Sequence, residues 1–212
     1  MNCIEIFKKL NYFDLNIKIK LDKEILVIQG PSGSGKTSIF DCISGITNPD
    51  KGEIILNDKI VYSSEKNINL PIKDRGVGYV FQNYGLFPHM TVKDNIMFGV
   101  KNNKNCQVDE SHGEYVMEIL KIDHLKNRYP KEISGGEKQR VALARALAIK
   151  PNIMIMDEPF SALDSKTKEL VYKEFLEFKK VCDVSIILVT HDTYEAKLLG
   201  DRIINIKDGA LM

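Results

Sequence analysis

The sequence ILVIQGPSGSGKTSIFDCIS, residues 25–44, decides the fold, because an apolar run, a glycine-rich loop and a helical pattern follow one another in it. Residues 30–37 match the pattern GxxxxGK[ST] of phosphate-binding loops. Glycines let backbone N–H groups turn toward phosphate oxygens without steric clash, and the positive end of the following helix points at the same oxygens. A strand, loop and helix in this order predict an α/β protein with a nucleotide site.

The loop residues have separate expected tasks. Those that should hold the phosphates of ATP are Gly30, Pro31, Ser32, Gly33, Ser34, Gly35, Lys36 and Thr37. Lys36 is expected to reach the β and γ phosphates, and the hydroxyl of Thr37 is expected to bind Mg²⁺. The competing interpretation, an ordinary turn rich in glycine and serine, is disfavoured by the strand before the loop and the helix after it.

Four short apolar runs predict the central strands. They occupy residues 25–28, 77–81, 153–156 and 186–189, and such runs are typical of parallel strands buried on both faces. Residues 15–21 instead alternate apolar and polar, and residues 53–62 indicate a hairpin around Asn57-Asp58. We therefore predict an antiparallel layer near the N-terminus. Catalytic residues are expected beyond the carboxyl ends of the parallel strands.

Two carboxylates, Asp157 and Glu158, follow one of the apolar runs. Asp157 is expected to hold Mg²⁺, mostly through the water shell of the ion. Glu158 is expected to accept a proton from the water that attacks the γ phosphate. Alone, such a pair would be a solvated strand end, but beside a phosphate loop it completes a site for phosphoryl transfer.

A third motif, SGGEKQR at residues 134–140, begins a predicted helix that ends near residue 149. Ser134 and Glu137 have the spacing of a capping box, which is a structural role. The paired glycines after the cap also leave backbone N–H groups bare at a positive helix end, which suits an anion.

Composition excludes several classes of protein. Lys and Arg total 30 and Asp and Glu total 29, so the net charge of +1 argues against a surface for nucleic acid or anionic lipid. No run of about 18 apolar residues predicts a membrane-spanning helix. The four cysteines form no CxxC pair, which favours reduced thiols in the cytosol.

Six blocks follow one another along the chain: the phosphate loop, Gln82, SGGEKQR, MDEP at 156–159, SALD at 161–164 and TH at 190–191. Together they resemble the ATPase subunit of ABC transporters. The resemblance covers nearly the whole chain. It implies an α/β fold of the P-loop NTPase class, with a RecA-like parallel sheet, an N-terminal antiparallel β layer and a helical insert specific to the family. Residues 1–212 would form one ATPase domain, with a core at 1–86 and 134–212 and a helical subdomain at about 87–133.

Inside that insert, residues 92–98 and 114–125 carry helical patterns. Residues 101–113 are polar and aperiodic, so a surface loop is expected there.

The resemblance also implies catalytic roles. Gln82 would sense Mg²⁺ and the attacking water, and His191 would hold the γ phosphate and orient Glu158. The catalytic set is then Glu158, His191, Gln82 and Lys36, and the metal set is Thr37, Gln82 and Asp157.

Other residues would act between two subunits that enclose two ATP molecules. Ser134, Gly135 and Gly136 would contact the γ phosphate of ATP bound to the other subunit, and residues 161–164, including Asp164, would communicate between subunits. The partner would be a second copy or a related subunit.

Two positions depart from the family pattern. The common signature LSGGQ is replaced by ISGGE, so Glu137 adds a negative charge, although we expect activity to survive. Where the family often stacks an aromatic ring on adenine, this chain has Leu10, with Tyr12 and Phe13 nearby.

The sequences GYVFQ at 78–82 and LFPH at 86–89 resemble bacterial importer ATPases, most of all the molybdate, tungstate and sulfate group. Polyamine, ferric-iron and thiamine importers share part of these motifs. An exporter and a soluble ABC ATPase without a transport role are competing interpretations. An importer subunit would lie on the cytoplasmic face of the cell membrane, bound to a permease that works with a substrate-binding protein.

The apolar residues between positions 84 and 90 would dock that permease, with packing of the helical insert as the competing interpretation. Because the sequence stops at Met212, we expect no C-terminal regulatory β domain.

Overall fold

One sheet runs through the part of the chain that the computed structural model describes, which is residues 1–102, 110–181 and 183–212. Its eleven strands, in those described residues, lie in the order β6-β5-β4-β1-β2-β11-β10-β3-β9-β8-β7. Their bounds are β1 (Asn2–Lys9), β2 (Asp14–Leu21), β3 (Ile25–Gln29), β4 (Lys51–Leu56), β5 (Lys59–Ser63), β6 (Ile68–Asn69), β7 (Val77–Val80), β8 (Ile153–Asp157), β9 (Ser185–Val189), β10 (Arg202–Lys207) and β11 (Ala210–Leu211).

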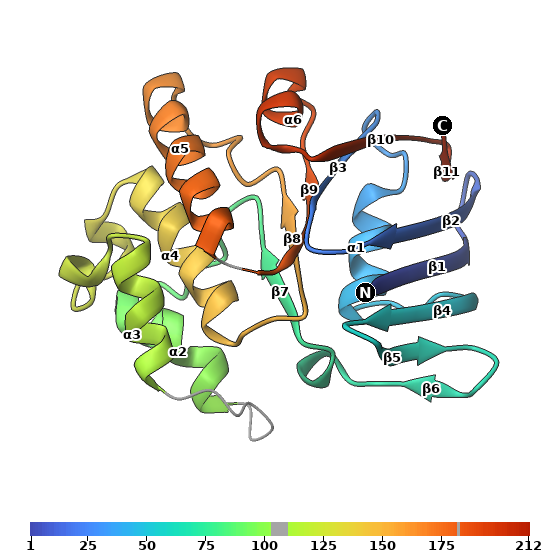
Figure 1. Cartoon of the computed structure of the whole chain (residues 1–212), viewed down its shortest axis with the longest axis horizontal. Coiled ribbons are helices and arrows are strands. Elements are labelled where there is room, and N and C mark those ends of the chain that lie inside the picture. The colour runs from blue at the N-terminus through green and yellow to red at the C-terminus, as the bar shows by residue number, and fades with distance from the viewer. Residues whose placement is uncertain (103–109, 182) are drawn as a thin grey trace.

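The helices connect and cover these strands (Figure 1). They are α1 (Lys36–Ser44), α2 (Val92–Asn102), α3 (Glu110–Ile119), α4 (Gly135–Ala148), α5 (Ser165–Val181) and α6 (Thr193–Leu199), with short 3₁₀ turns η1 (Ile72–Asp74), η2 (Asp123–Leu125) and η3 (Pro130–Glu132).

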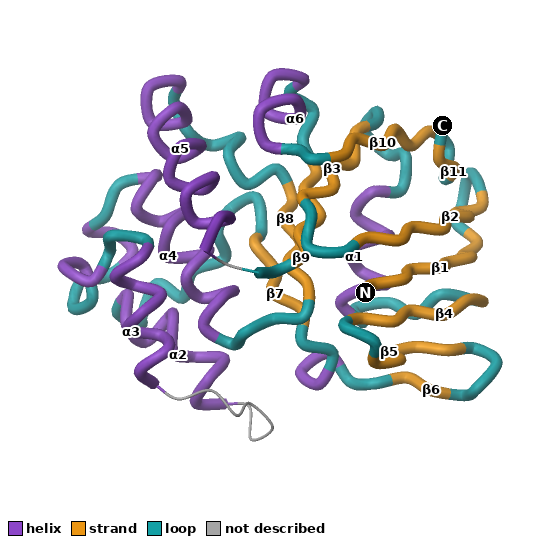
Figure 2. The backbone as a smooth tube through the Cα atoms, viewed as in Figure 1, coloured by secondary structure: helices purple, strands orange, loops and turns teal. Residues whose placement is uncertain are grey.

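The sheet has a parallel part and an antiparallel part, and Figure 2 shows its strands in orange. Strands β10, β3, β9, β8 and β7 pair in parallel, and four of them, β3, β7, β8 and β9, are the strands that the apolar runs predicted. The prediction of a central strand is wrong for β7, which lies at the edge of the sheet and is half-buried on one face. Strands β2, β1, β4, β5 and β6 pair antiparallel, which confirms the predicted N-terminal layer and its hairpin. β1 was not predicted, although its alternating residues Ile4 and Ile6 are buried.

Successive residues of the parallel strands belong to two different apolar clusters. In β3, Ile25 and Val27 belong to the cluster on the side of α4, whereas Leu26 and Ile28 belong to the cluster on the side of α1. Both faces of the central strands are therefore covered, which explains why their sequences are almost continuously apolar.

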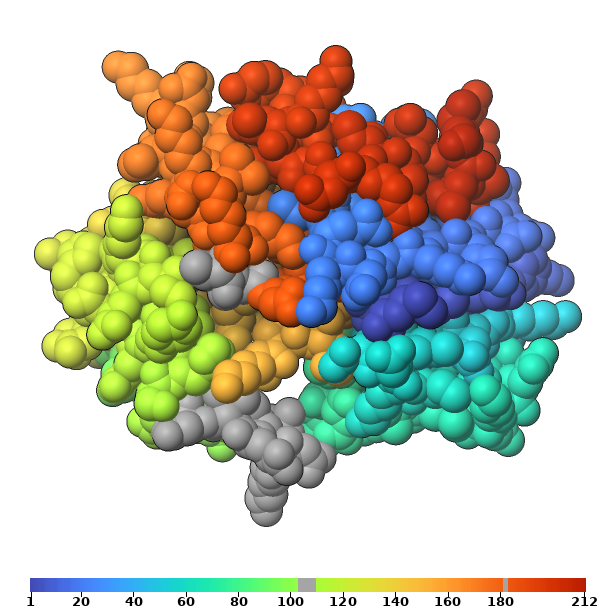
Figure 3. Space-filling view, in the orientation of Figure 1, coloured from blue at the N-terminus to red at the C-terminus, as the bar shows by residue number. Residues whose placement is uncertain are grey.

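The helices α2, α3 and α4 pack together. Figure 3 shows the yellow-green part of the chain at one end of the molecule and the cyan part toward the other. The predicted helix at 114–125 and loop at 101–113 are wrong in their bounds. α3 begins at Glu110 and ends at Ile119, where Lys121 adopts a φ of +55°. Residues 110–113 are polar and aperiodic, which favours a loop, but they form the first turn of α3. Gly113 is buried there, and a Cβ at this position would lie 2.3 Å from Met97 Sδ.

Positions 101–102 belong to α2, whereas positions 103–109 of the predicted loop lie outside the described residues. The division into a core and an insert at 87–133 stays a prediction.

Two of the cysteines, Cys3 and Cys42, are free thiols. Cys106 and Cys182 lie outside the described residues.

None of the helices in the described ranges has both the length and the apolar character needed to cross a bilayer.

Arg75 is fully buried and holds the far end of the helix that starts at the phosphate loop. Its Nη1 donates to the carbonyl oxygens of Cys42 and Ile43, at 2.8 and 3.1 Å, and its Nε donates to the Leu70 carbonyl at 2.9 Å. The carboxyl end of α1 carries partial negative charge, so a buried guanidinium stabilises it. Burial lowers the pKa of Arg75 from its ordinary value. The segment that leads into β7 is thereby fixed to α1.

Replacing Arg75 with Met should lower the free energy of unfolding by about 3 kcal/mol, because several buried carbonyl oxygens lose a charged donor. Arg75→Lys keeps the charge and one donor and should cost less. Urea denaturation at pH 7 measures both variants. A loss below about 1 kcal/mol for Arg75→Met would show that water replaces the guanidinium at no great cost.

Candidate functional site

The predicted phosphate loop connects β3 to α1. Gly33 and Gly35 have φ values of +79° and +103°, in the left-handed region that favours glycine. Lys36 lies over the loop, where its Nζ donates to the carbonyl oxygens of Gly30 and Pro31, each at 2.8 Å. Burial lowers the pKa of Lys36, and the charges of Glu158 and then Asp157 act in the opposite direction.

An open cleft of about 690 Å³ lies at this loop. Ten of the predicted site residues line it: Gly30, Ser32, Gly33, Gly35, Lys36, Thr37, Gln82, Asp157, Glu158 and His191. Two other loop residues do not. Ser34 is 2% exposed and its backbone N–H closes a turn by donating to the Pro31 carbonyl at 3.2 Å. Pro31 and Ser34 thus take part in a turn of the loop backbone and not in the lining of the cleft.

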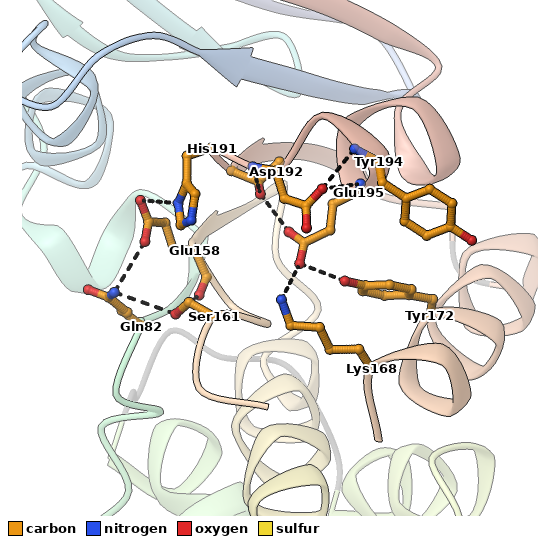
Figure 4. Close-up of polar contacts among 10 residues, drawn as sticks. Gln82, Glu158, Ser161, Lys168, Tyr172, His191, Asp192, Tyr194 and Glu195 are labelled. Atoms are coloured by element: carbon orange, nitrogen blue, oxygen red, sulfur yellow. Dashed lines mark hydrogen bonds and ion pairs between the residues drawn. The ribbon is translucent and has the colours of Figure 1, made fainter. Parts of the chain in front are cut away.

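Glu158 lies between two other predicted catalytic residues (Figure 4). Gln82 Nε2 donates to Glu158 Oε2 at 3.2 Å, and His191 Nδ1 lies 3.2 Å from Glu158 Oε1. These residues follow the neighbouring strands β7, β8 and β9, so parallel pairing brings them to one edge of the sheet. The Glu158 side chain is 26% exposed and that of His191 is 70% exposed, so both can meet a ligand in the cleft.

Glu158 also has unusual backbone geometry, with a φ of +43° in the left-handed region. Its N–H donates to the Val189 carbonyl at 3.0 Å, and its own carbonyl accepts a bond from Ser161 Oγ at 2.8 Å. Left-handed backbone is uncommon for a residue other than glycine and persists where neighbours fix it. The carboxylate is thus held in the cleft by the turn after β8.

Asp157 is half-buried at the end of β8. Burial raises the pKa of its carboxyl group, the charge of Glu158 adds to this rise, and Lys36 opposes it. Thr37 and Gln82 line the same cleft, so a hydroxyl, an amide and a carboxylate are available as oxygen ligands.

This donor set fits Mg²⁺, which takes few protein ligands and keeps waters or phosphate oxygens in its other positions. Within residues 1–102, 110–181 and 183–212, no group of three or more His, Cys, Asp or Glu side chains could form a metal cage.

The motif SGGEKQR begins α4, and the predicted capping box is confirmed. Glu137 N donates to Ser134 Oγ at 3.3 Å, while Glu137 Oε2 accepts bonds from Ser134 N at 2.7 Å and from Ser134 Oγ at 2.8 Å. The Ser134 backbone bond is the main cause of the lowered pKa of Glu137. Ser134, Gly135 and Gly136 do not line the cleft of their own chain.

Asp164 does not line the cleft either. It is exposed at the start of α5, where Oδ1 accepts bonds from the N–H groups of Lys166 and Thr167, both at 3.1 Å. The hydroxyl of Thr167 donates to Oδ2 at 2.6 Å and is the first cause of the lowered pKa of Asp164. Within one chain, Asp164 is a helix cap.

The segment after β1 forms another wall of the cleft, with Leu10, Tyr12 and Phe13 among its residues. Leu10 packs against the apolar cluster beside α1, whereas the side chain of Tyr12 is 95% exposed. Two aromatic rings, those of Tyr12 and Phe13, therefore line the cleft beside Leu10, the position where the family often has its aromatic residue.

The sequence did not indicate a polar cluster that lies behind His191. The cluster joins Thr190 and Glu195 to Lys168 and Tyr172, on α5 (Figure 4). A glutamate in the first turn of a helix is an ordinary sequence feature, so no pattern marked Glu195 as a residue that would be only 2% exposed.

Comparison with known proteins agrees with this geometry. The sequence profile of the ABC transporter family matches residues 12–161. The chain is 43% identical over 200 residues to the trehalose/maltose import ATP-binding protein MalK of Thermococcus litoralis, with 93% of this chain and 53% of the relative covered. It is 44% identical over 199 residues to the molybdate/tungstate import ATP-binding protein WtpC of Methanocaldococcus jannaschii, with 93% and 64% covered.

A solved structure of a dimeric ATP-binding cassette in a post-hydrolysis state, bound to ADP and Pi, aligns with a TM-score of 0.77 at 28% identity. The alignment covers 100% of this chain and 96% of that one. The chain thus matches a whole cassette but spans only 53% and 64% of the two import proteins. The predicted α/β P-loop NTPase fold is confirmed, and the chain belongs to the ABC transporter family.

Proposed function

We propose that this chain is the ATP-hydrolysing subunit of an ABC importer. The observation that carries the proposal is the Glu158 carboxylate, which contacts Gln82 and His191 in the cleft that contains the phosphate loop. Two relatives named as import ATP-binding proteins support the direction of transport.

The phosphate loop would bind the triphosphate of ATP through its backbone N–H groups and through Lys36. The ammonium group of Lys36 is already directed over the loop by the carbonyls of Gly30 and Pro31. Thr37, Gln82 and Asp157 would hold Mg²⁺, which when bound neutralises charge on the β and γ phosphates.

Hydrolysis would depend on Glu158 as the general base that takes a proton from the attacking water. Gln82 and His191 contact the two different carboxylate oxygens, Oε2 and Oε1, so together they limit rotation of the carboxyl group. A base held in one orientation needs less reorganisation during the reaction. His191 would also hold the γ phosphate, because its side chain is exposed toward the cleft.

The second half of each site would come from another subunit. Ser134, Gly135, Gly136 and Asp164 do not line the cleft of their own chain, and Ser134 and Asp164 are exposed. A second copy, or a related subunit, would place Ser134, Gly135 and Gly136 against the γ phosphate, and Asp164 would take part in contacts between the subunits. The dimeric cassette to which this chain is similar supports such an assembly.

Substituting Glu158→Gln should lower the ATPase rate at least about 100-fold, because the general base is lost while the side-chain shape is kept. Sedimentation velocity with Mg²⁺ and ATP should then show a stable dimer. Glu169→Gln, an exposed carboxylate on α5, is the matched control and should behave like the wild type. Hydrolysis by Glu158→Gln at the wild-type rate would exclude Glu158 as the base.

Glu137 should weaken this dimer, because its carboxylate accepts both the N–H and the hydroxyl of Ser134 and adds a negative charge there. In a Glu158→Gln background, Glu137→Gln should tighten dimerisation with ATP about fivefold, the effect expected of one screened charge. Glu132→Gln is a matched control, since Glu132 caps the neighbouring turn by accepting from the Tyr129 N–H at 2.6 Å. An unchanged or weaker dimer with Glu137→Gln would contradict this electrostatic effect.

We propose that the segment from Tyr84 to Met90 docks a cytoplasmic helix of the permease. Tyr84 is buried and Leu86 packs against the core, so the competing packing role holds for these two residues. Phe87 is half-buried, with its ring 4.7 Å from that of Phe98, and Phe98 is itself exposed. Phe87 and the half-buried Met90 thus remain as the apolar side chains of this segment for a partner, and the ring of Phe98 extends the surface.

Phe87→Asp should uncouple hydrolysis from transport, because a buried contact with the permease would receive an unpaired charge. The measurements are copurification with the permease and uptake in reconstituted vesicles, beside the ATPase rate of the subunit. Ile72→Asp is the control, since Ile72 is exposed elsewhere, at 56%. An intact complex with full transport in Phe87→Asp would exclude docking at this segment.

We propose molybdate or a related oxyanion as the transported substrate, supported by the relative from Methanocaldococcus jannaschii. The sugar import protein is about as similar, so the family leaves several substrates open, including polyamines, iron and thiamine. An export role, or a soluble ABC ATPase without transport, would use the same cassette fold. The working location would be the cytoplasmic face of the cell membrane, bound to the permease and served by a substrate-binding protein. Stimulation of ATPase in the purified complex by each substrate class separates these cases.

A further inference from the structure

Glu195 is a buried carboxylate that none of the proposed catalytic steps uses. It lies in the first turn of α6 and is 2% exposed. It accepts three hydrogen bonds: from Thr190 Oγ1 at 2.5 Å, from Tyr172 Oη at 2.6 Å and from Lys168 Nζ at 3.1 Å (Figure 4). A buried carboxylate with three donors, one of them charged, is well satisfied and fixed in direction.

The hydrogen bond from Thr190 connects Glu195 to the main chain on both sides of His191. Thr190 directly precedes His191, and its Oγ1 also accepts a bond from the Asp192 N–H at 3.1 Å. Asp192 in turn caps α6, because its Oδ1 accepts bonds from the N–H groups of Tyr194 and Glu195 at 2.7 and 3.3 Å. The main chain that carries His191 is therefore tied to the helix that carries Glu195.

The other two bonds connect Glu195 to α5. Lys168 and Tyr172 lie on the first turns of that helix, which begins directly after Asp164. The Lys168–Glu195 ion pair is largely shielded from water, since the two side chains are 23% and 3% exposed. Burial and the bond to Glu195 raise the pKa of Tyr172, so its hydroxyl stays a donor at neutral pH.

A role in stability alone does not account for this arrangement. Buried ion pairs contribute little net stability, because desolvation offsets the attraction, and apolar side chains of similar size often do as well. A directional network instead selects one arrangement of the groups that it joins. Here those groups are the His191 segment and the start of α5.

We propose that Glu195 is a positioning residue for His191, which holds the imidazole against Glu158 through Thr190. This inference rests on the proposed ATPase function for its kinetic consequence, but its geometric content does not depend on that function. Lys168 and Tyr172 fix the Glu195 carboxylate, so they act one step further away. Because the same contacts connect α5 to the His191 segment, a displacement of α5 would also move His191.

The kinetic test is a double-mutant cycle in the full chain. Glu195→Gln should lower kcat for ATP about tenfold, since contacts within one network typically couple by this amount. In a His191→Ala background, which is itself slow, the same substitution should change kcat less than about twofold. Glu174→Gln is the matched control, because Glu174 also forms a shielded ion pair on α5, with Arg140 at 2.6 Å. An equal loss from Glu195→Gln in both backgrounds would overturn the proposal.

A second measurement reads the position of His191 without hydrolysis. Ring ¹⁵N signals of His191, assigned with His191→Ala, report the population of the tautomer that carries the proton on Nδ1, the nitrogen facing Glu158. That population should fall in Glu195→Gln and stay unchanged in Glu174→Gln. If the ring signals are the same in the wild type and Glu195→Gln, the positioning role is wrong whether or not the chain hydrolyses ATP. If the signals move but the wild type has no ATPase activity, the proposed function is wrong and the positioning role stands.

Discussion

Parallel pairing of β7, β8 and β9 is the constraint on which the candidate site depends. Gln82, Glu158 and His191 each follow one of these strands, and neighbouring parallel strands end at the same edge of the sheet. The Glu158 carboxylate then accepts a bond from Gln82 and faces His191 on its other oxygen. The phosphate loop leaves β3, the next strand along, so Lys36 reaches the same cleft. Residues far apart in the sequence thus meet because the strands that carry them are neighbours.

The sequence alone predicted the structure correctly where a residue type has one main physical use. Continuous apolar runs are typical of strands covered on both faces, and the runs at 25–28, 153–156 and 186–189 are buried strands inside the sheet. The run at 77–81 is instead the edge strand β7, in which Val77 and Tyr79 are half-buried. Ser134 and Glu137 have the spacing of a capping box, and that box is formed. Glycines in the phosphate loop indicated left-handed backbone, which Gly33 and Gly35 adopt.

The sequence alone did not predict the structure where burial reverses the usual behaviour of a residue. Arg75 and Glu195 are charged, so their sequence pattern favours exposure, yet tertiary contacts bury both. Tyr12 and Phe13 line the cleft because of the turn between β1 and β2, and the local sequence does not specify which side chains of such a turn face outward. The first turn of α3 is polar and aperiodic in sequence, so the pattern predicted a loop, although Gly113 packs there against Met97.

The most direct test of the site is a crystal structure of this chain with Mg²⁺ and a non-hydrolysable ATP analogue. We expect Lys36 to contact the β and γ phosphates, and Glu158, Gln82 and His191 to surround the γ phosphate. We also expect Ser134 of a second copy to contact the same phosphate from the other side. A nucleotide bound outside the cleft, or a γ phosphate that contacts neither Glu158 nor His191, would contradict the proposed site.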